Sequence, residues 1–146
     1  MKKRLDKYEW GGGTMVLYFS GEQDMEQIQS IDEKVVMFRT HEDVVSKRGS
    51  VREAGRKWWR CNGARARRAD YAFVVIDGVV RGVYKIMDAR LEERGDDPAC
   101  LPFDSPRWAF DMCEKAVPND VRDRYKDKHL PDEYHKWGQN PVRYTF

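Results

Sequence analysis

Cysteine and histidine are scarce in this 146-residue chain, which has three of each. Cys61, Cys100 and Cys113 are an odd number and include no C-x-x-C pair, so we expect reduced thiols and no disulfide framework. None of the three histidines stands at zinc-ligand spacing from these cysteines, which argues against a structural zinc site. The sequence therefore predicts neither a bound metal nor another cofactor.

Long apolar runs are also missing. No stretch approaches the roughly 18 apolar residues that a transmembrane helix needs. The basic residues 2–4 are followed by a charged segment, not by the apolar core of a secretory signal. We therefore expect no membrane association and a cytoplasmic location.

Standard catalytic motifs are absent as well. The chain has no H-E-x-x-H, no G-x-S-x-G and no Walker loop, and the triplet at residues 11–13 is a glycine-rich stretch with no G-K-[ST] after it. Asp70 and Lys85 could face each other across a hairpin as in some metal nucleases, but Val83 stands where a D-x-K or E-x-K motif needs an acid. No catalytic residue is assigned.

What the chain does have is charge and aromatic side chains. Charged residues make up 36% and aromatic residues 12%, which argues against a wholly disordered chain. The length is typical of a single domain of about 100–200 residues. Such a length can bury a core of its own.

The net charge of +2 hides two opposed regions. Residues 47–68 contain nine basic residues and one acid, Glu53, for a net +8, whereas the rest of the chain sums to −6. Seven of the nine are arginine, whose planar fork fits phosphates and base edges and stacks on flat rings. Such a concentration of positive charge is typical of a phosphate-binding surface. The alternatives are a solvated face, or pairing with the acids elsewhere in the chain.

Hydrophobic patterning predicts an α+β fold with a mixed, mostly antiparallel sheet. Asp77-Gly78 is a strong hairpin-turn signal. Strands are predicted over residues 34–40, 71–76, 79–86, 107–114 and 142–146. Residues 1–33 are treated as an extension with a glycine-rich loop, a short strand over 14–19 and a short helix over 22–31. Residues 88–106 and 129–141 are predicted to be surface loops.

A helix is predicted to begin at Ser50 as N-cap, with Glu53 completing a capping-box pattern. Residues 51, 54, 55 and 58 then share one face, which makes Trp58 a core residue. Arg52, Arg56 and Arg60, spaced by four, form a stripe on another face. A second short helix is predicted from Asn62 to residue 69, and a third over residues 118–126.

The middle and the end of the chain resemble a known superfamily. The resemblance is carried by R-K-W-W-R at 56–60, by A-D-Y-A-F-V-V-I-D-G-V-V-R-G-V-Y-K-I at 69–86, by R-W-A-F at 107–110 and by W-G-Q-N-P-V-R-Y at 137–144. Residues 34–146 are similar to uncharacterised bacterial and phage proteins of the PUA-like superfamily, which includes the ASCH, EVE and YTH domains. The resemblance implies a small curled β-barrel, with short helices on its rim, that binds RNA or DNA. Such domains often hold one modified base in an aromatic pocket, but no established pocket residue of the family can be carried over.

Two groups of residues are candidates for nucleic-acid contact. In the basic segment, Trp59 is the candidate for stacking on a base, and its alternative role is to close the edge of the core. The proposed phosphate contacts beside it are Arg52, Arg56, Arg60, Arg65 and Arg68.

The second group lies before the last strand. Trp137 could stack on a base, and the amides of Gln139 and Asn140 could pair with an adenine edge. Pro141 favours an extended Asn140, so Gly-Gln-Asn-Pro can also be a simple turn.

The sequence thus predicts a module that binds nucleic acid, either RNA or a modified base in DNA, or a nucleotide. Two other classes stay open. One is an enzyme acting on a nucleotide or nucleic acid by hydrolysis or nuclease chemistry. The other is a phage or defence protein whose basic surface contacts an acidic protein.

Overall fold

The computed structural model describes residues 25–97, 99 and 101–146. The loop at residues 11–13 and the strand predicted over 14–19 lie outside the described residues. Of the helix predicted over residues 22–31, the described part contains no helical residue, so that prediction is wrong for residues 25–31. Instead Gln27 forms a β-bridge with His129, and Ile28 is buried in the same cluster as Val35.

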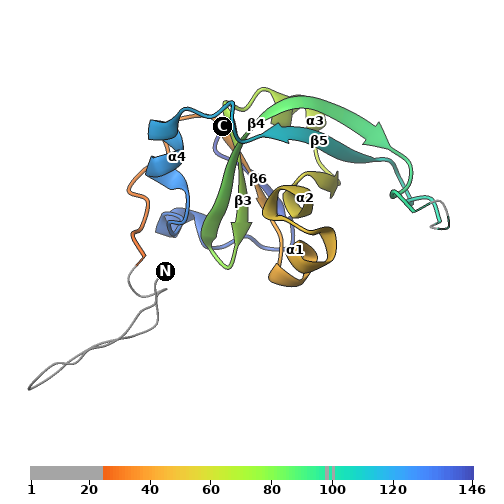
Figure 1. Ribbon diagram of the computed structural model, residues 1–146, viewed down its shortest axis with the longest axis horizontal. Coiled ribbons are helices and arrows are strands. Elements are labelled where there is room, and N and C mark those ends of the chain that lie inside the picture. Colours follow the sequence, from red (N-terminus) through yellow and green to blue (C-terminus); the bar gives the residue numbers. More distant parts are fainter. Residues whose placement is uncertain (1–24, 98, 100) are drawn as a thin grey trace, which may run out of the picture.

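One six-stranded sheet, in the order β2-β5-β4-β3-β1-β6, organises the protein (Figure 1). The strands are β1 (Val35–Arg39), β2 (Lys57–Trp59), β3 (Tyr71–Ile76), β4 (Val79–Glu92), β5 (Arg107–Cys113) and β6 (Val142–Tyr144). β1 and β3 are parallel and every other neighbouring pair is antiparallel. The predicted α+β class is confirmed, but among the described residues the sheet ends at β2 and β6 and is not closed into a barrel.

The helices are short. They are α1 (Glu42–Arg48), α2 (Val51–Gly55), α3 (Gly63–Arg67), α4 (Asn119–Tyr125) and the 3-10 helix η2 (Asp132–Tyr134). The predicted caps of two of them are confirmed. Ser50 Oγ accepts the Glu53 N–H at 3.1 Å, and Asn62 Oδ1 accepts the Arg65 N–H at 3.0 Å. In the described part of the chain, no helix combines the length and the apolar character needed to cross a bilayer.

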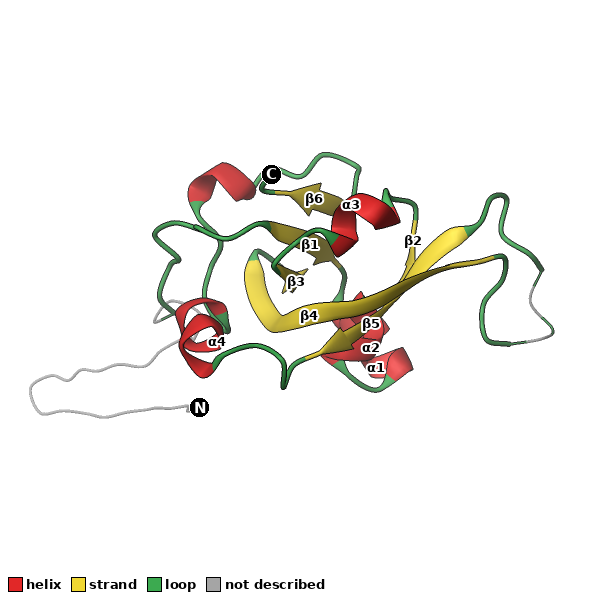
Figure 2. Cartoon of the chain, turned by 90° about the horizontal axis from the view of Figure 1, so that it is seen from above, coloured by secondary structure: helices red, strands yellow, loops and turns green. Residues whose placement is uncertain are grey.

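The hairpin between β3 and β4 has the predicted turn. Asp77 and Gly78 have φ of 52° and 78°, the left-handed values that a two-residue hairpin loop requires. β4 is longer than expected, because it runs on to Glu92 and pairs with β5 as far as Arg107. Residues 88–92 of the predicted surface loop over residues 88–106 therefore belong to β4, which forms with β5 a two-stranded ribbon that extends away from the body in Figure 2.

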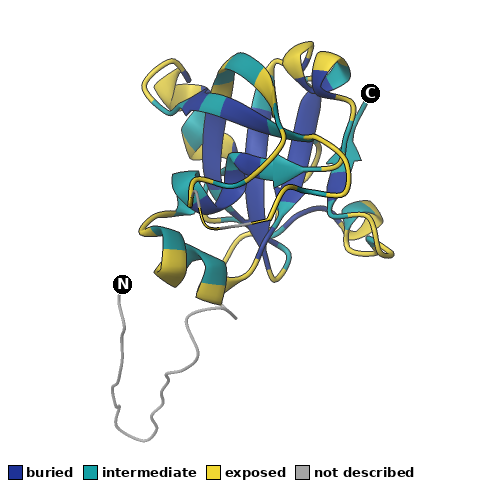
Figure 3. Ribbon diagram, turned by 90° about the vertical axis from the view of Figure 1, so that its right-hand side faces the viewer, coloured by how far each residue is buried: buried dark blue, intermediate teal, exposed yellow. Residues whose placement is uncertain are grey.

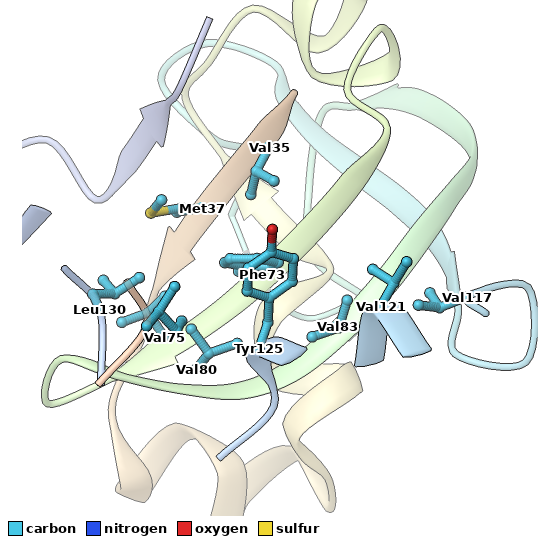
Figure 4. Close-up of a cluster of buried hydrophobic side chains, with 11 residues drawn as sticks. Val35, Met37, Phe73, Val75, Val80, Val83, Val117, Val121, Tyr125 and Leu130 are labelled. Atoms are coloured by element: carbon cyan, nitrogen blue, oxygen red, sulfur yellow. The ribbon is translucent and has the colours of Figure 1, made fainter. Parts of the chain in front are cut away.

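The strands of the sheet are largely buried (Figure 3), and the core is formed by side chains on both faces of the sheet. In β1 and β3, alternate residues belong to two different buried clusters, and this explains their continuous apolar sequence. One cluster packs Phe73 against Tyr125 of α4, with ring centroids 5.1 Å apart (Figure 4). The other contains Phe38 and Phe110. Since both faces are covered, the ends of the strands and the loops there are the places left for a site.

Candidate functional site

The basic segment does not form the predicted continuous helix. α2 ends at Gly55, and residues 57–59 form β2, which pairs with β5. Gly55 packs so closely on β3 that a Cβ there would lie 2.2 Å from Cγ2 of Val74. The prediction that Arg52, Arg56 and Arg60 form a stripe on one helix face is therefore wrong.

Arg52 and Arg56 lie on either side of Glu53, the only acid of the basic segment. Arg52 Nη1 is 2.6 Å from one Glu53 carboxylate oxygen, and Arg56 Nε is 2.9 Å from the other. Arg52 Nε also donates to the Met112 carbonyl at 2.6 Å. Both arginines thus have intramolecular partners, and a phosphate would share them with Glu53.

The other predicted arginines lie elsewhere. Arg60 is exposed and 3.7 Å from the Asp104 carboxylate, and Arg68 is exposed at the end of α3. The Arg65 guanidinium stacks on Tyr144 at 4.1 Å from the ring centre. α3 stands apart from α1 and α2 in Figures 1 and 2, so the +8 segment covers separate surfaces.

Trp59 has the alternative role left open for it, at the edge of the core, whereas the prediction of Trp58 as a core residue is wrong. Trp59 packs on Phe38 of the core at 5.3 Å, and its indole N–H donates to the Gly55 carbonyl at 2.9 Å. Trp58 belongs to neither core cluster and is flanked by the cations of Arg48 and Lys57, at 5.0 and 4.7 Å from its ring centre. Because residues 57–59 form an irregular strand and not a helix, the helical face that predicted Trp58 as a core residue does not exist.

Two hollows adjoin the carboxyl end of β1. The first, the Trp58 hollow, has a volume of about 290 Å³ and is lined by both tryptophans of β2 together with Arg48 and Lys57. The second, the Trp137 hollow, has a volume of about 410 Å³ and is lined by Trp137, His135 and the hairpin turn. They share three consecutive residues at the end of β1: Arg39, Thr40 and His41.

The charge of these hollows is mostly positive. Their walls carry the basic side chains of Arg39, Arg48 and Lys57, with Asp77 as the one carboxylate. Arg39 lies over the Trp137 ring at 5.5 Å and donates to a loop carbonyl at 3.3 Å, so it joins the two hollows. Burial lowers the pKa of Arg48. An anionic ligand with a flat ring fits this combination of cations and aromatic walls.

Sequence reasoning found Trp59 and Trp137 but missed Arg39, Arg48 and Lys57 as members of one site. The available signal was the polar Arg-Thr-His run at residues 39–41, directly after a buried strand. The exposed Gln139 is not among the residues that line either hollow. Asn140 uses its side-chain oxygen to accept the Val142 N–H at 3.0 Å, which is the turn role left open for it.

The described residues offer little for metal or thiol chemistry. Among them no group of three or more His, Cys, Asp or Glu side chains could hold a metal ion. Burial raises the pKa of Cys61 to about 11, so its thiol is protonated at neutral pH and is a poor nucleophile.

Comparison of this chain with known proteins found no similar protein. No protein-family model matches the chain, and neither a curated protein nor a solved structure matches it.

Proposed function

We propose that this protein is a nucleic-acid-binding module that takes an unpaired base of RNA, or a modified base of DNA, into the two hollows at the end of β1. The observation that carries the proposal is that the hollows share Arg39, Thr40 and His41 between two aromatic walls. The Trp58 and Trp59 side supplies one wall and Trp137 the other. The resemblance of residues 34–146 to PUA-like domains supports the same class of ligand.

The physical basis is the way single-stranded bases are held. Unstacked bases bind to aromatic rings and arginine planes, while Lys and Arg track the phosphates. The volume of about 410 Å³ lies near the lower end of the ~300–1,000 Å³ range of ligand pockets, and that of about 290 Å³ just below it. A single base with its sugar-phosphate is a ligand of suitable size and charge.

The test is fluorescence anisotropy with labelled single-stranded RNA, single-stranded DNA and DNA carrying modified bases, each over a salt series. Trp137→Ala should weaken binding by about 5- to 150-fold, since one base–aromatic stack is worth about 1–3 kcal/mol. Arg39→Gln should weaken binding and make the log–log salt slope shallower by about 0.7–0.9, the value for one lost phosphate contact. Arg122→Gln on α4 is the matched control and should change neither quantity.

The arginines of the basic segment are tested in the same assay. Replacing Arg52, Arg56 and Arg60 together by alanine should lower both the affinity and the salt slope. If affinity and slope are intact in this variant, the segment does not contact phosphates. Circular dichroism of each variant shows that a lost affinity does not reflect a lost fold.

Two outcomes would contradict the proposal. Turnover of labelled RNA, DNA or modified nucleosides would identify an enzyme. Purification free of nucleic acid, with no binding to any of the oligonucleotides, would favour the protein-interaction module instead.

A further inference from the structure

The ammonium group of Lys57 is buried next to the Trp58 ring. Lys57 is only 8% exposed, which is rare for a lysine unless an anion neutralises it. Within the described part of the chain its one oxygen partner is the carboxylate of Asp96, which forms an ion pair with it. The buried charge therefore depends on an anion that another part of the chain supplies.

That anion comes from outside the sheet. Asp96 follows the end of β4, 39 positions along the chain from Lys57, and its side chain is 72% exposed. Besides the bond to Lys57, the charges of Arg56 and Arg48 lower the pKa of Asp96. A single exposed carboxylate thus neutralises the buried Lys57 ammonium group.

Arg48 has spare capacity to bind an anion. Its Nη1 donates to main-chain carbonyls, at 3.5 Å from both Glu53 O and Ala54 O, and also to Lys57 O. Among the described residues no carboxylate lies within 4.0 Å of the Arg48 guanidinium. Arg48 and Lys57 both line the Trp58 hollow, so the cations face the space that a ligand would enter.

We propose that Lys57 and Arg48 form a phosphate-binding site, and that Asp96 occupies it in the free protein. A carboxylate and a phosphate oxygen make the same charge-assisted hydrogen bonds to lysine and arginine. The inference rests on the proposed function in one respect, because the phosphate is that of the nucleotide whose base enters the hollows. The Asp96 carboxylate then competes with the phosphate for this site and lowers the affinity of the protein for the phosphate.

The loop that carries Asp96 has its own anchors. The Trp58 indole N–H donates to Glu92 at 2.6 Å, and Phe103 packs on the Trp58 ring at 5.8 Å. Gly95 lies against the same ring, where a Cβ would be 3.2 Å from Trp58. Because these contacts do not involve the Asp96 carboxylate, Asp96→Asn removes the charge and leaves the loop in place.

Pyrophosphate, titrated calorimetrically into the full chain, probes the site alone. Asp96→Asn should bind pyrophosphate about tenfold more tightly than the unaltered protein, because the competing carboxylate is gone. Asp97→Asn is the matched control, since it removes the same charge from the neighbouring residue, whose carboxylate accepts a local hydrogen bond from the Ala99 N–H at 2.9 Å. It should change the affinity by less than about twofold, as expected for an exposed charge.

A second readout is thermal. Asp96→Asn leaves the Lys57 ammonium without its anion, so its Tm should be lower than that of Asp97→Asn, and pyrophosphate should restore it. Equal affinities of the two variants, or no binding to Asp96→Asn, would overturn the phosphate site.

Oligonucleotide binding separates this inference from the proposed function. Tighter pyrophosphate binding by Asp96→Asn without oligonucleotide binding would support the site and refute the nucleic-acid module. Oligonucleotide binding that is equal in the Asp96 and Asp97 variants would support the module and refute Asp96 as its competitor.

Discussion

Replacing Gly63 by alanine is expected to destabilise the protein, although alanine is normally favoured over glycine in a helix. Gly63 is the first residue of α3 and lies directly on the face of the Trp108 indole. A Cβ at this position would be 2.2 Å from Trp108 Cδ2 and 2.3 Å from Cε3. Non-bonded carbon atoms prefer about 3.5–4.0 Å, so the helix or the ring must move by more than about 1 Å.

The size of the effect follows from two opposed terms. Alanine gains up to about 1 kcal/mol over glycine from helix propensity. Overpacking costs about 1–3 kcal/mol, and the upper half of that range applies because the Trp108 ring also stacks on Phe110, with centroids 6.5 Å apart. The net loss in the free energy of unfolding is therefore about 1–2 kcal/mol.

Urea denaturation measures this loss. With an m-value of about 1–2 kcal/mol/M, the midpoint for Gly63→Ala should fall by about 1 M with m unchanged. In a Trp108→Leu background the same change should cost less than about 0.5 kcal/mol, because the rigid ring is gone. An unchanged or higher midpoint for Gly63→Ala, or an equal cost in both backgrounds, would refute the close contact between α3 and Trp108.

The remaining stability predictions concern a helix cap and two buried phenols. Ser50→Ala should cost about 0.5–2 kcal/mol in urea denaturation, because it removes the acceptor of the Glu53 N–H, whereas Ser46→Ala, at an exposed site within α1, should cost nothing. Equal effects of the two changes would argue against the cap. Burial raises the pKa of both Tyr84 and Tyr125 to about 12. Between pH 10 and 12 the unfolded chain then loses protons that the folded protein keeps, so stability should fall by about 1.4 kcal/mol per pH unit for each tyrosine. The same urea series at rising pH checks this, and a fall that is as steep after Tyr84→Phe and Tyr125→Phe would contradict it.

Much of the fold is predictable from short stretches of sequence. The Asp77-Gly78 turn, the Ser50 cap and the Asn62 cap each depend on backbone geometry within a few residues, and all three are present. β3 has the predicted bounds because its apolar run is uninterrupted. The α+β class follows from these elements.

The secondary structure of the R-K-W-W-R segment at residues 56–60 could not be predicted from its own residues. A 3.6-residue pattern runs through it, yet the chain leaves the helix after Gly55 and pairs with β5, which begins at Arg107. With the helix ended, the helical face that predicted Trp58 as a core residue does not exist. The separate pairing of β4 with β5 runs as far as Glu92 and Arg107, and Asp96, just after β4, forms an ion pair with Lys57.

By itself, the sequence determined the strand and turn signals, the concentration of arginine in residues 47–68 and the aromatic content that a base-binding site would need. Only the tertiary structure decided which of these residues meet. Glu53 neutralises part of the arginine segment, while Arg39 of β1, Arg48 of α1 and Lys57 of β2 converge on the hollows at the end of the sheet. The physical reason is that caps and turns are local in the chain, whereas a binding surface depends on strand pairing between residues far apart in sequence.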